Sequence, residues 1–289
     1  MKLAFSTLGC PEWDLDRIIT AAREWGYDGV EWRGYQDEME LPRAPIFTAA
    51  ARNETRRRFQ DSALEFVCLG SSVRLSDPAP ERRERERSAF AAYAELARFL
   101  GCGLVRVFGG NLPSGVDRAA ALPEMAAFVR ELGEIAAEHG VTLVLETHDA
   151  FSTGAQVAEL LRRADHPSVG ALWDLHHPYR QGEPPETTVQ VLDPYLRHAH
   201  VKDSRDGHYC LMGEGDVPLA RMLGLLRERG YEGWISVEWE KRWHPEIAAP
   251  EEVFPQYARR LRELLDIIPS SHHQSPAAPS SAPGTSGGA

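Results

Sequence analysis

The chain has 289 residues with 43% hydrophobic and 26% charged side chains, and a formal net charge of −11. This composition is typical of globular proteins and excludes a disordered chain, a coiled coil or a collagen-like fibre. The acidic balance argues against non-specific nucleic-acid binding, which depends on cationic contacts to phosphates.

Targeting and redox signals are few. No apolar run approaches the ~20 residues that span a bilayer, and residues 1–10 lack the apolar core of a signal peptide. The four cysteines are widely spaced without a C-x-x-C pair, so neither a disulfide framework nor a cysteine-rich zinc site is indicated. We therefore expect a cytoplasmic protein that does not act on membranes.

Short apolar runs alternate with segments of helical spacing along most of the chain. The predicted strands cover residues 3–7, 29–32, 65–70, 104–108, 141–146, 169–174, 198–202 and 234–238. Apolar residues recur at three- and four-residue steps in 81–100 and 119–139, and a last helix is expected at 251–267. Several helical segments end at a glycine before the next run, as left-handed C-terminal caps do: Gly26, Gly101, Gly140 and Gly230.

Eight such units predict a single (β/α)8 TIM barrel over residues 1–268. An open doubly wound sheet is the alternative, but no G-x-G-x-x-G follows the first strand and no phosphate-binding G-x-x-x-x-G-K-[ST] occurs. Residues 269–289 are rich in Ser, Pro, Gly and Ala and lack Leu, Ile, Val and Phe, so we expect a flexible tail there.

Four successive predicted strands end in a side chain that can bind a metal: Glu146, Asp174, His200 and Glu238. Strand ends converge at the C-terminal face of a barrel, where three clustered carboxylates would repel one another. One acidic residue at a strand end is commonly a helix cap or half of a salt bridge, whereas four on consecutive strands indicate a site for one divalent ion. Mixed oxygen and nitrogen ligands suit Mn²⁺, Mg²⁺ or Co²⁺, with Zn²⁺ as a further option.

The segments LETHDAFSTG, WDLHHP, HAHVKD and SVEWE, together with YDGVEWRG near the start, resemble the sugar phosphate isomerase/epimerase family of xylose isomerase-like barrels. Relatives include ketose 3-epimerases, hydroxypyruvate isomerases and inosose dehydratases. The resemblance implies metal ligation by the same four residues, substrate contact by His177, and proton transfer by Glu146 and Glu238. One departure is Ser152, where ketose 3-epimerases carry a glutamate.

We therefore expect a metal-dependent isomerase or epimerase of a small sugar, sugar phosphate or related hydroxyketone. It would remove a proton α to the carbonyl and pass through a metal-stabilised ene-diolate. A dehydratase of a keto-polyol is the alternative, because it begins with the same proton abstraction. An endonuclease-like barrel acting at abasic sites is less favoured, since it builds its site from more histidines. A homodimer or homotetramer is the expected assembly.

Five further residues are candidates for substrate binding. Lys202 lies two residues after His200 on the same side of its strand and could neutralise an enediolate or bind phosphate. Glu31 and Arg33 share one face at the end of the second strand, Arg106 lies inside the fourth, and His148 follows the fifth. For each of them the alternative is a structural role, as a salt bridge at the rim or a partner of a barrel carboxylate.

Overall fold

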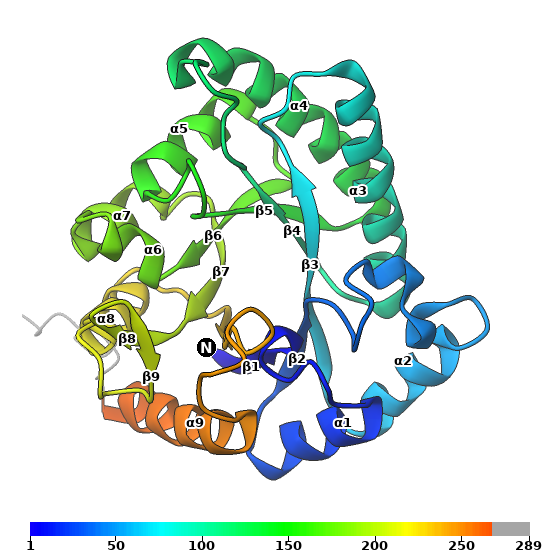
Figure 1. Cartoon of the computed structure of the whole chain (residues 1–289), viewed down its shortest axis with the longest axis vertical. Coiled ribbons are helices and arrows are strands. Elements are labelled where there is room, and N and C mark those ends of the chain that lie inside the picture. Colours follow the sequence, from blue (N-terminus) through cyan, green and yellow to red (C-terminus); the bar gives the residue numbers. More distant parts are fainter. Residues whose placement is uncertain (268–289) are drawn as a thin grey trace, which may run out of the picture.

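The computed structural model describes residues 1–267, in which parallel strands close into a barrel surrounded by helices (Figure 1). The strands follow the order β1-β10-β7-β6-β5-β4-β3-β2 around the barrel, so each strand lies beside its neighbours in sequence and the last closes onto the first. The barrel strands are β1 Lys2–Ser6, β2 Gly29–Trp32, β3 Glu65–Arg74, β4 Leu104–Phe108, β5 Thr142–Glu146, β6 Val169–Asp174, β7 Leu196–Val201 and β10 Trp234–Val237. The predicted fold is confirmed.

The helices form a ring outside the barrel (Figure 1). They are α1 Leu15–Glu24, α2 Arg52–Asp61, α3 Pro80–Leu100, α4 Arg118–His139, α5 Gly154–Ala164, α6 His176–Arg180, α7 Pro185–Leu192, α8 Leu219–Glu228 and α9 Pro250–Ile267. Short 3₁₀ turns follow the first two strands: η1 Thr7–Gly9, η2 Leu41–Arg43 and η3 Pro45–Phe47. Helix α9 covers the junction of the first and last strands, where the ring of Phe254 stacks on Phe5 at 4.5 Å.

Local sequence explains where the long helices lie and end. The apolar positions that recur at helical spacing in α3 and α4, such as Phe90 and Leu132, are buried against the barrel. Both helices end at glycines in the left-handed conformation, Gly101 at φ 77° and Gly140 at φ 67°. Side chains rarely tolerate this conformation, so glycine stops the helix and turns the chain towards the next strand.

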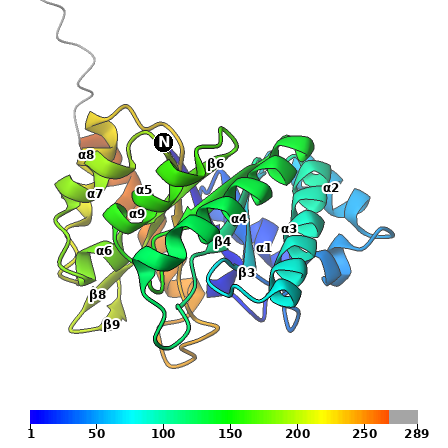
Figure 2. The same cartoon turned by 90° about the horizontal axis from the view of Figure 1, so that it is seen from above.

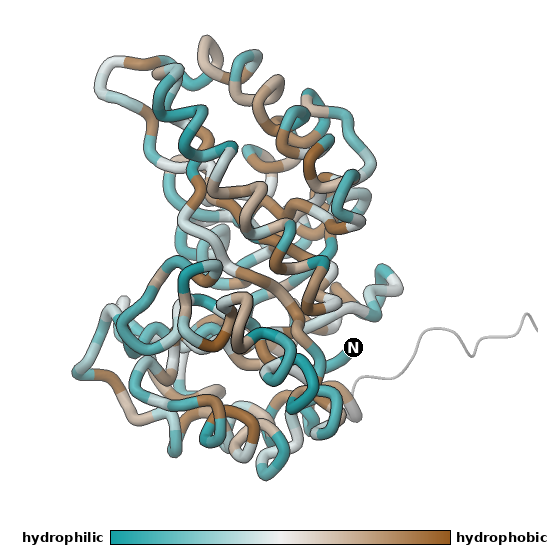
Figure 3. The backbone as a smooth tube through the Cα atoms, turned by 90° about the vertical axis from the view of Figure 1, so that its right-hand side faces the viewer, coloured by the Kyte–Doolittle hydropathy of each residue, from teal (hydrophilic) through white to brown (hydrophobic). Residues whose placement is uncertain are grey.

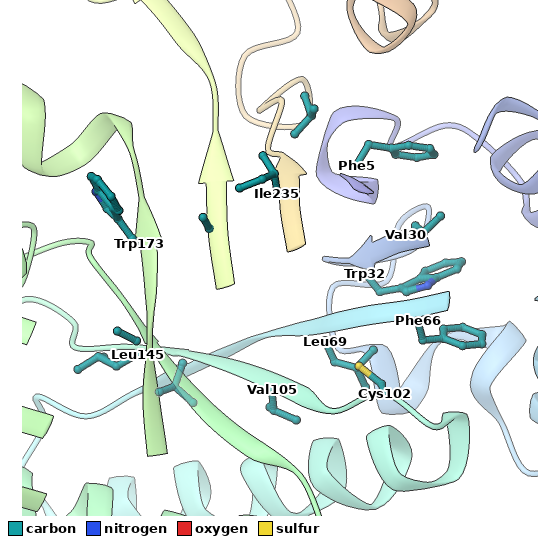
Figure 4. Close-up of a cluster of buried hydrophobic side chains, with 14 of the residues drawn as sticks. Phe5, Val30, Trp32, Phe66, Leu69, Cys102, Val105, Leu145, Trp173 and Ile235 are labelled. Atoms are coloured by element: carbon teal, nitrogen blue, oxygen red, sulfur yellow. The ribbon is translucent and has the colours of Figure 1, made fainter. Parts of the chain in front are cut away.

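Two apolar layers hold the barrel together. The larger layer lies between strands and helices and includes Trp32, Phe66 and Trp173 (Figure 4). A much smaller cluster, which includes Cys68, Val144 and Leu172, fills one end of the barrel interior. The backbone coloured by hydropathy shows brown segments in the middle of the molecule and mixed colours along the outer helices (Figure 3). The barrel interior beyond the small cluster is polar.

The C-terminal ends of the strands form the mouth of the barrel. An antiparallel hairpin of β8 (Asp203–Arg205) and β9 (His208–Cys210) follows β7 there, an element that sequence periodicity did not predict. The hairpin and the segment after β10 project from the side of the molecule away from the N-terminus (Figure 2). The flexible tail expected at residues 269–289 lies outside the described residues. Among the described helices, none combines the length and apolar character needed to cross a membrane.

Candidate metal centre

The four predicted ligands meet at the barrel mouth. Glu146 and Asp174 are the last residues of β5 and β6, His200 is the second-last residue of β7, and Glu238 directly follows β10. All four residues are buried, with at most 5% of the surface of each exposed. One ligand atom from each lies within 4.8 Å of those of the other three. Strand order therefore brings together residues that are up to 92 positions apart in sequence.

The distances leave room for one ion among these atoms. Nδ1 of His200 lies 3.3 Å from Oε1 of Glu146, 3.3 Å from Oε2 of Glu238 and 3.9 Å from Oδ2 of Asp174. Within the described residues, both carboxylate oxygens of Glu146 and Nδ1 of His200 are buried without a hydrogen-bond partner. Buried polar atoms of a folded protein normally have partners, and a divalent cation would satisfy these three atoms at once. These carboxylate oxygens and this imidazole nitrogen fit the divalent metal ion that the sequence predicts.

Charge interactions keep the two glutamates ionised. Burial and the charge of Glu238 raise the pKa of Glu146, but Arg106 and His200 outweigh them and hold this pKa at about 2. Burial likewise raises the pKa of Glu238, and His200 and Lys202 lower it well below its ordinary value. Both side chains are therefore carboxylates at neutral pH, as ligands or proton acceptors must be.

Lys202 is the buried cation of the site. Its Nζ donates hydrogen bonds to Oδ2 of Asp174 at 2.7 Å and to Oε2 of Glu238 at 2.6 Å, and lies 2.8 Å from Oε1 of Glu240. Burial lowers the pKa of Lys202, but these carboxylates raise it well above its ordinary value. The amine thus contacts two predicted metal ligands directly. The salt bridge expected as its structural alternative is present, with Glu238 as a partner. Substrate contact by Lys202 stays a prediction.

Glu31 lies behind His200, away from the mouth. Its Oε1 is 2.9 Å from Nε2 of His200, and its Oε2 is 2.7 Å from Nε2 of His198. Burial raises the pKa of Glu31, but the two histidines lower it far below its ordinary value. A carboxylate in this place fixes the orientation of the imidazole and aims Nδ1 at the other ligands. Its contacts favour this positioning role over the substrate contact expected from sequence.

Arg106 supports the other side of the site. Its Nε lies 3.2 Å from Oε2 of Glu146, its Nη1 donates to the Ser71 carbonyl at 3.1 Å, and its guanidinium lies 3.8 Å from the ring centre of Phe108. Arg33, which directly follows β2, is also buried, and its side chain lies next to Gly70 of β3, as that of Arg106 does. Arg106 therefore pairs with a barrel carboxylate, the contact expected as its structural alternative, and substrate contact by Arg106 stays a prediction.

Two histidines line the mouth beside Asp174. The rings of His148 and His177 are 4.7 Å apart, and Nε2 of His177 lies 3.8 Å from Oδ2 of Asp174 without a hydrogen-bond partner. Burial, followed by the charge of Lys202, lowers the pKa of His177 to about 3, so this imidazole is neutral and can hydrogen-bond a neutral substrate oxygen. Burial lowers the pKa of His148, but the contact with Asp149 raises it overall.

The structure adds three residues that sequence reasoning did not identify. His198 contacts Glu31, Glu240 contacts Lys202, and the Tyr209 hydroxyl donates to Oε1 of Glu240 at 2.9 Å. His198 and Glu240 each lie two residues from a predicted ligand, on the same side of the chain, and that spacing was the available signal. Tyr209 belongs to the unpredicted hairpin, and its short sequence carries no comparable signal.

Comparison with known proteins shows which family the chain belongs to. The family model described as xylose isomerase-like TIM barrel matches residues 19–264. The chain belongs to this family. A fructoselysine 3-epimerase from Escherichia coli O157:H7 is 25% identical over 281 residues, covering 92% of this chain and 98% of that protein. An inosose dehydratase from Yersinia enterocolitica is 30% identical over 162 residues, covering 47% of this chain and 53% of that protein.

A solved structure shares the fold of this chain. The IolI protein, crystallised with a zinc atom, superposes with a TM-score of 0.79 at 18% identity, covering 93% of this chain and 100% of that one. The resemblance inferred from sequence is confirmed, and the relatives named here include a sugar epimerase and a dehydratase. Use of manganese, a cytoplasmic location and a homo-oligomer stay predictions.

Proposed function

We propose that the protein is a divalent-metal-dependent isomerase or epimerase of a small sugar or related hydroxyketone. The observation that carries this proposal is the convergence of Glu146, Asp174, His200 and Glu238, with buried carboxylate and imidazole atoms that lack partners. The epimerase relative and the zinc-containing family structure support it. When bound, a divalent ion would supply Lewis acidity that stabilises negative charge on adjacent substrate oxygens.

The protein side chains would move the proton. Glu146 is the last residue of β5 and Glu238 follows β10, and these two strands are separated in the barrel by β6 and β7. Two carboxylates on opposite sides of a substrate can act as a base and an acid on its two faces. If one removes the proton α to the carbonyl and the other returns a proton to the opposite face, the carbon is epimerised. Return to the neighbouring carbon gives an aldose–ketose isomerisation.

Three further groups would support this chemistry. Glu31 holds the ring of His200, Lys202 balances the charge of the carboxylates, and neutral His177 donates to or accepts from a substrate oxygen. The burial of these groups also limits water at the reacting carbon, which strengthens their electrostatic effect.

A dehydratase is the second candidate, because dehydratases are among the relatives and share the first step. After the same proton abstraction, loss of a β-hydroxyl as water would give an unsaturated ketone. Ser152 stands where the resemblance implies the glutamate of ketose 3-epimerases, and this departure favours the second candidate. Its side chain donates to the Asp149 carbonyl at 2.8 Å and so caps a local turn.

Proton exchange separates these possibilities. The protein is stripped with EDTA, reloaded with Mn²⁺, Mg²⁺, Co²⁺ or Zn²⁺, and incubated with hydroxyketones in deuterated water. NMR detects exchange at the carbon α to the carbonyl for either activity, while near-ultraviolet absorbance detects only the unsaturated product of the dehydratase. Full activity without metal, or no exchange on a broad panel of hydroxyketones with every metal, would contradict the proposal.

A further inference from the structure

Arg33 is a buried cation whose side chain has no ion-pair or hydrogen-bond partner among residues 1–267. Its side chain and backbone together are 7% exposed, and Nη1 is inaccessible to solvent and donates to no acceptor. Within residues 1–267, no carboxylate oxygen lies within 4.0 Å of its nitrogens, although Glu40 and Glu238 are near enough to raise its pKa. An unpaired buried charge is costly to a folded protein, and an anion bound beside it would offset that cost.

The guanidinium of Arg106 lies beside the side chain of Arg33. A Cβ built on Gly70 of β3 would meet Cδ of Arg33 at 2.9 Å and Nη2 of Arg106 at 3.0 Å, so these two atoms lie within about 6 Å of each other. A larger residue at position 70 would have to displace one of the two arginine side chains, and glycine avoids this. Burial, followed by the charge of Arg106, lowers the pKa of Arg33 to about 10, and the group remains cationic at neutral pH.

The pair borders the metal centre. Arg33 follows Glu31 by two residues, and Glu31 points into the barrel towards β7, so Arg33 is on the inward side one step nearer the mouth. Arg106 reaches Glu146 through Nε at 3.2 Å and Gly70 through Nη2. An anion between the two guanidinium groups would therefore lie beside a predicted ligand, within reach of a small substrate held at the centre.

From this arrangement we propose that Arg33 and Arg106 form an anion subsite for the substrate. The substrate is then a hydroxyketone that carries a carboxylate or a phosphate group, and not a neutral free sugar. Planar guanidinium groups bind both anions through paired, charge-assisted hydrogen bonds, which are stronger than neutral ones. The assignment to a substrate group rests on the proposed function of the neighbouring centre, whereas anion binding itself does not.

The first experiment measures anion binding without metal or catalysis. Isothermal titration of the metal-free protein with inorganic phosphate and with glycolate compares wild type, Arg33→Gln and Arg163→Gln. Arg163 is an exposed arginine paired with Glu159 on a helix surface and serves as the matched control. We expect wild type and the control to bind at least one anion, and Arg33→Gln to lose about tenfold or more in affinity. No binding of either anion, or equal binding by all three proteins, overturns the subsite.

The second experiment links the anion to the substrate. Solvent proton exchange with the metal-loaded enzyme compares a neutral ketose, its terminal phosphate and a keto acid of similar length. We expect the ratio of kcat/KM for the preferred anionic substrate to that of the neutral one to fall about 10- to 100-fold in Arg33→Gln. If exchange occurs equally well with neutral and anionic substrates, this inference fails while the proposed function survives.

The two experiments also keep the inference separate from the proposed function. If no substrate exchanges, the proposed function fails, and the titration alone decides whether the arginines bind an anion. Arg33→Gln removes an unpaired buried charge, so we expect its melting temperature to equal or exceed that of wild type without ligand. Arg33→Lys is the second variant, because it keeps the charge but loses the planar fork, and should bind the anion with intermediate affinity.

Discussion

Lys202 is expected to be the main source of charge balance in the protein without metal. Its amine is fully buried and contacts the carboxylates of Asp174, Glu238 and Glu240 at 2.6 to 2.8 Å. Lys202→Met keeps a side chain of similar length but leaves these carboxylates without their cation. Removal of one partner from a buried ion pair costs about 3–5 kcal/mol, because the remaining charge stays buried and unpaired.

Denaturant unfolding of the EDTA-treated proteins measures this loss. We expect the free energy of unfolding of Lys202→Met to fall by about 3–5 kcal/mol, and its melting temperature by roughly 6–15 °C. Lys2→Met is the matched control: Lys2 forms an exposed ion pair with Glu65, and loss of such a pair costs at most about 1 kcal/mol. Added Mn²⁺ should stabilise Lys202→Met more than wild type, because the ion restores positive charge at the same carboxylates.

The reasoning is refuted if Lys202→Met unfolds within about 1 kcal/mol of wild type in EDTA. That result would mean that water or a local rearrangement stabilises the buried negative charge of these carboxylates as well as the amine of Lys202 does. A large loss of stability in the Lys2→Met control would instead show that the assay reports a general effect of removing lysines.

Three other outcomes are expected. Glu146→Gln and Glu238→Gln should each lower α-proton exchange by at least about 10²-fold, since each removes a ligand and a proton-transfer group; wild-type rates in both would contradict the acid–base assignment. EDTA should abolish exchange and Mn²⁺, Mg²⁺ or Co²⁺ should restore it, as measured by NMR in deuterated water. Glu31→Gln should weaken metal affinity about 10- to 100-fold in a competition titration, because His200 loses the carboxylate that orients it, and unchanged affinity would argue against that role.

Much of the site was predictable because barrel strands follow one another in order. Glu146, Asp174 and His200 end or nearly end their strands, so the periodicity of the chain was enough to bring them to one side of the mouth. Their chemistry then predicted a cation. The unpredicted hairpin of β8 and β9 shows the limit of this reasoning: three-residue strands carry too few side chains to display an alternation, and their pairing depends on the turn between them.

The roles of the remaining charged residues could not be read from spacing. Glu31 and Arg33 lie on one face of the same chain segment, yet Glu31 contacts His200 across the barrel, whereas the side chain of Arg33 has no partner in the described part of the chain. Which carboxylate a lysine or arginine reaches depends on distances across the barrel, and side-chain length and burial set these distances.

The amino-acid sequence by itself determined the order of strands and helices, the closed barrel, and the side of it where acidic groups and an imidazole gather, because periodicity and glycine caps act locally. Only the tertiary structure decided which buried charges neutralise one another. Lys202 contacts three carboxylates, Arg106 pairs with Glu146, and the described residues leave the side chain of Arg33 unpaired. The strength of a charge interaction depends on separation in space and exclusion of water, and neither is a property of neighbouring positions along a chain.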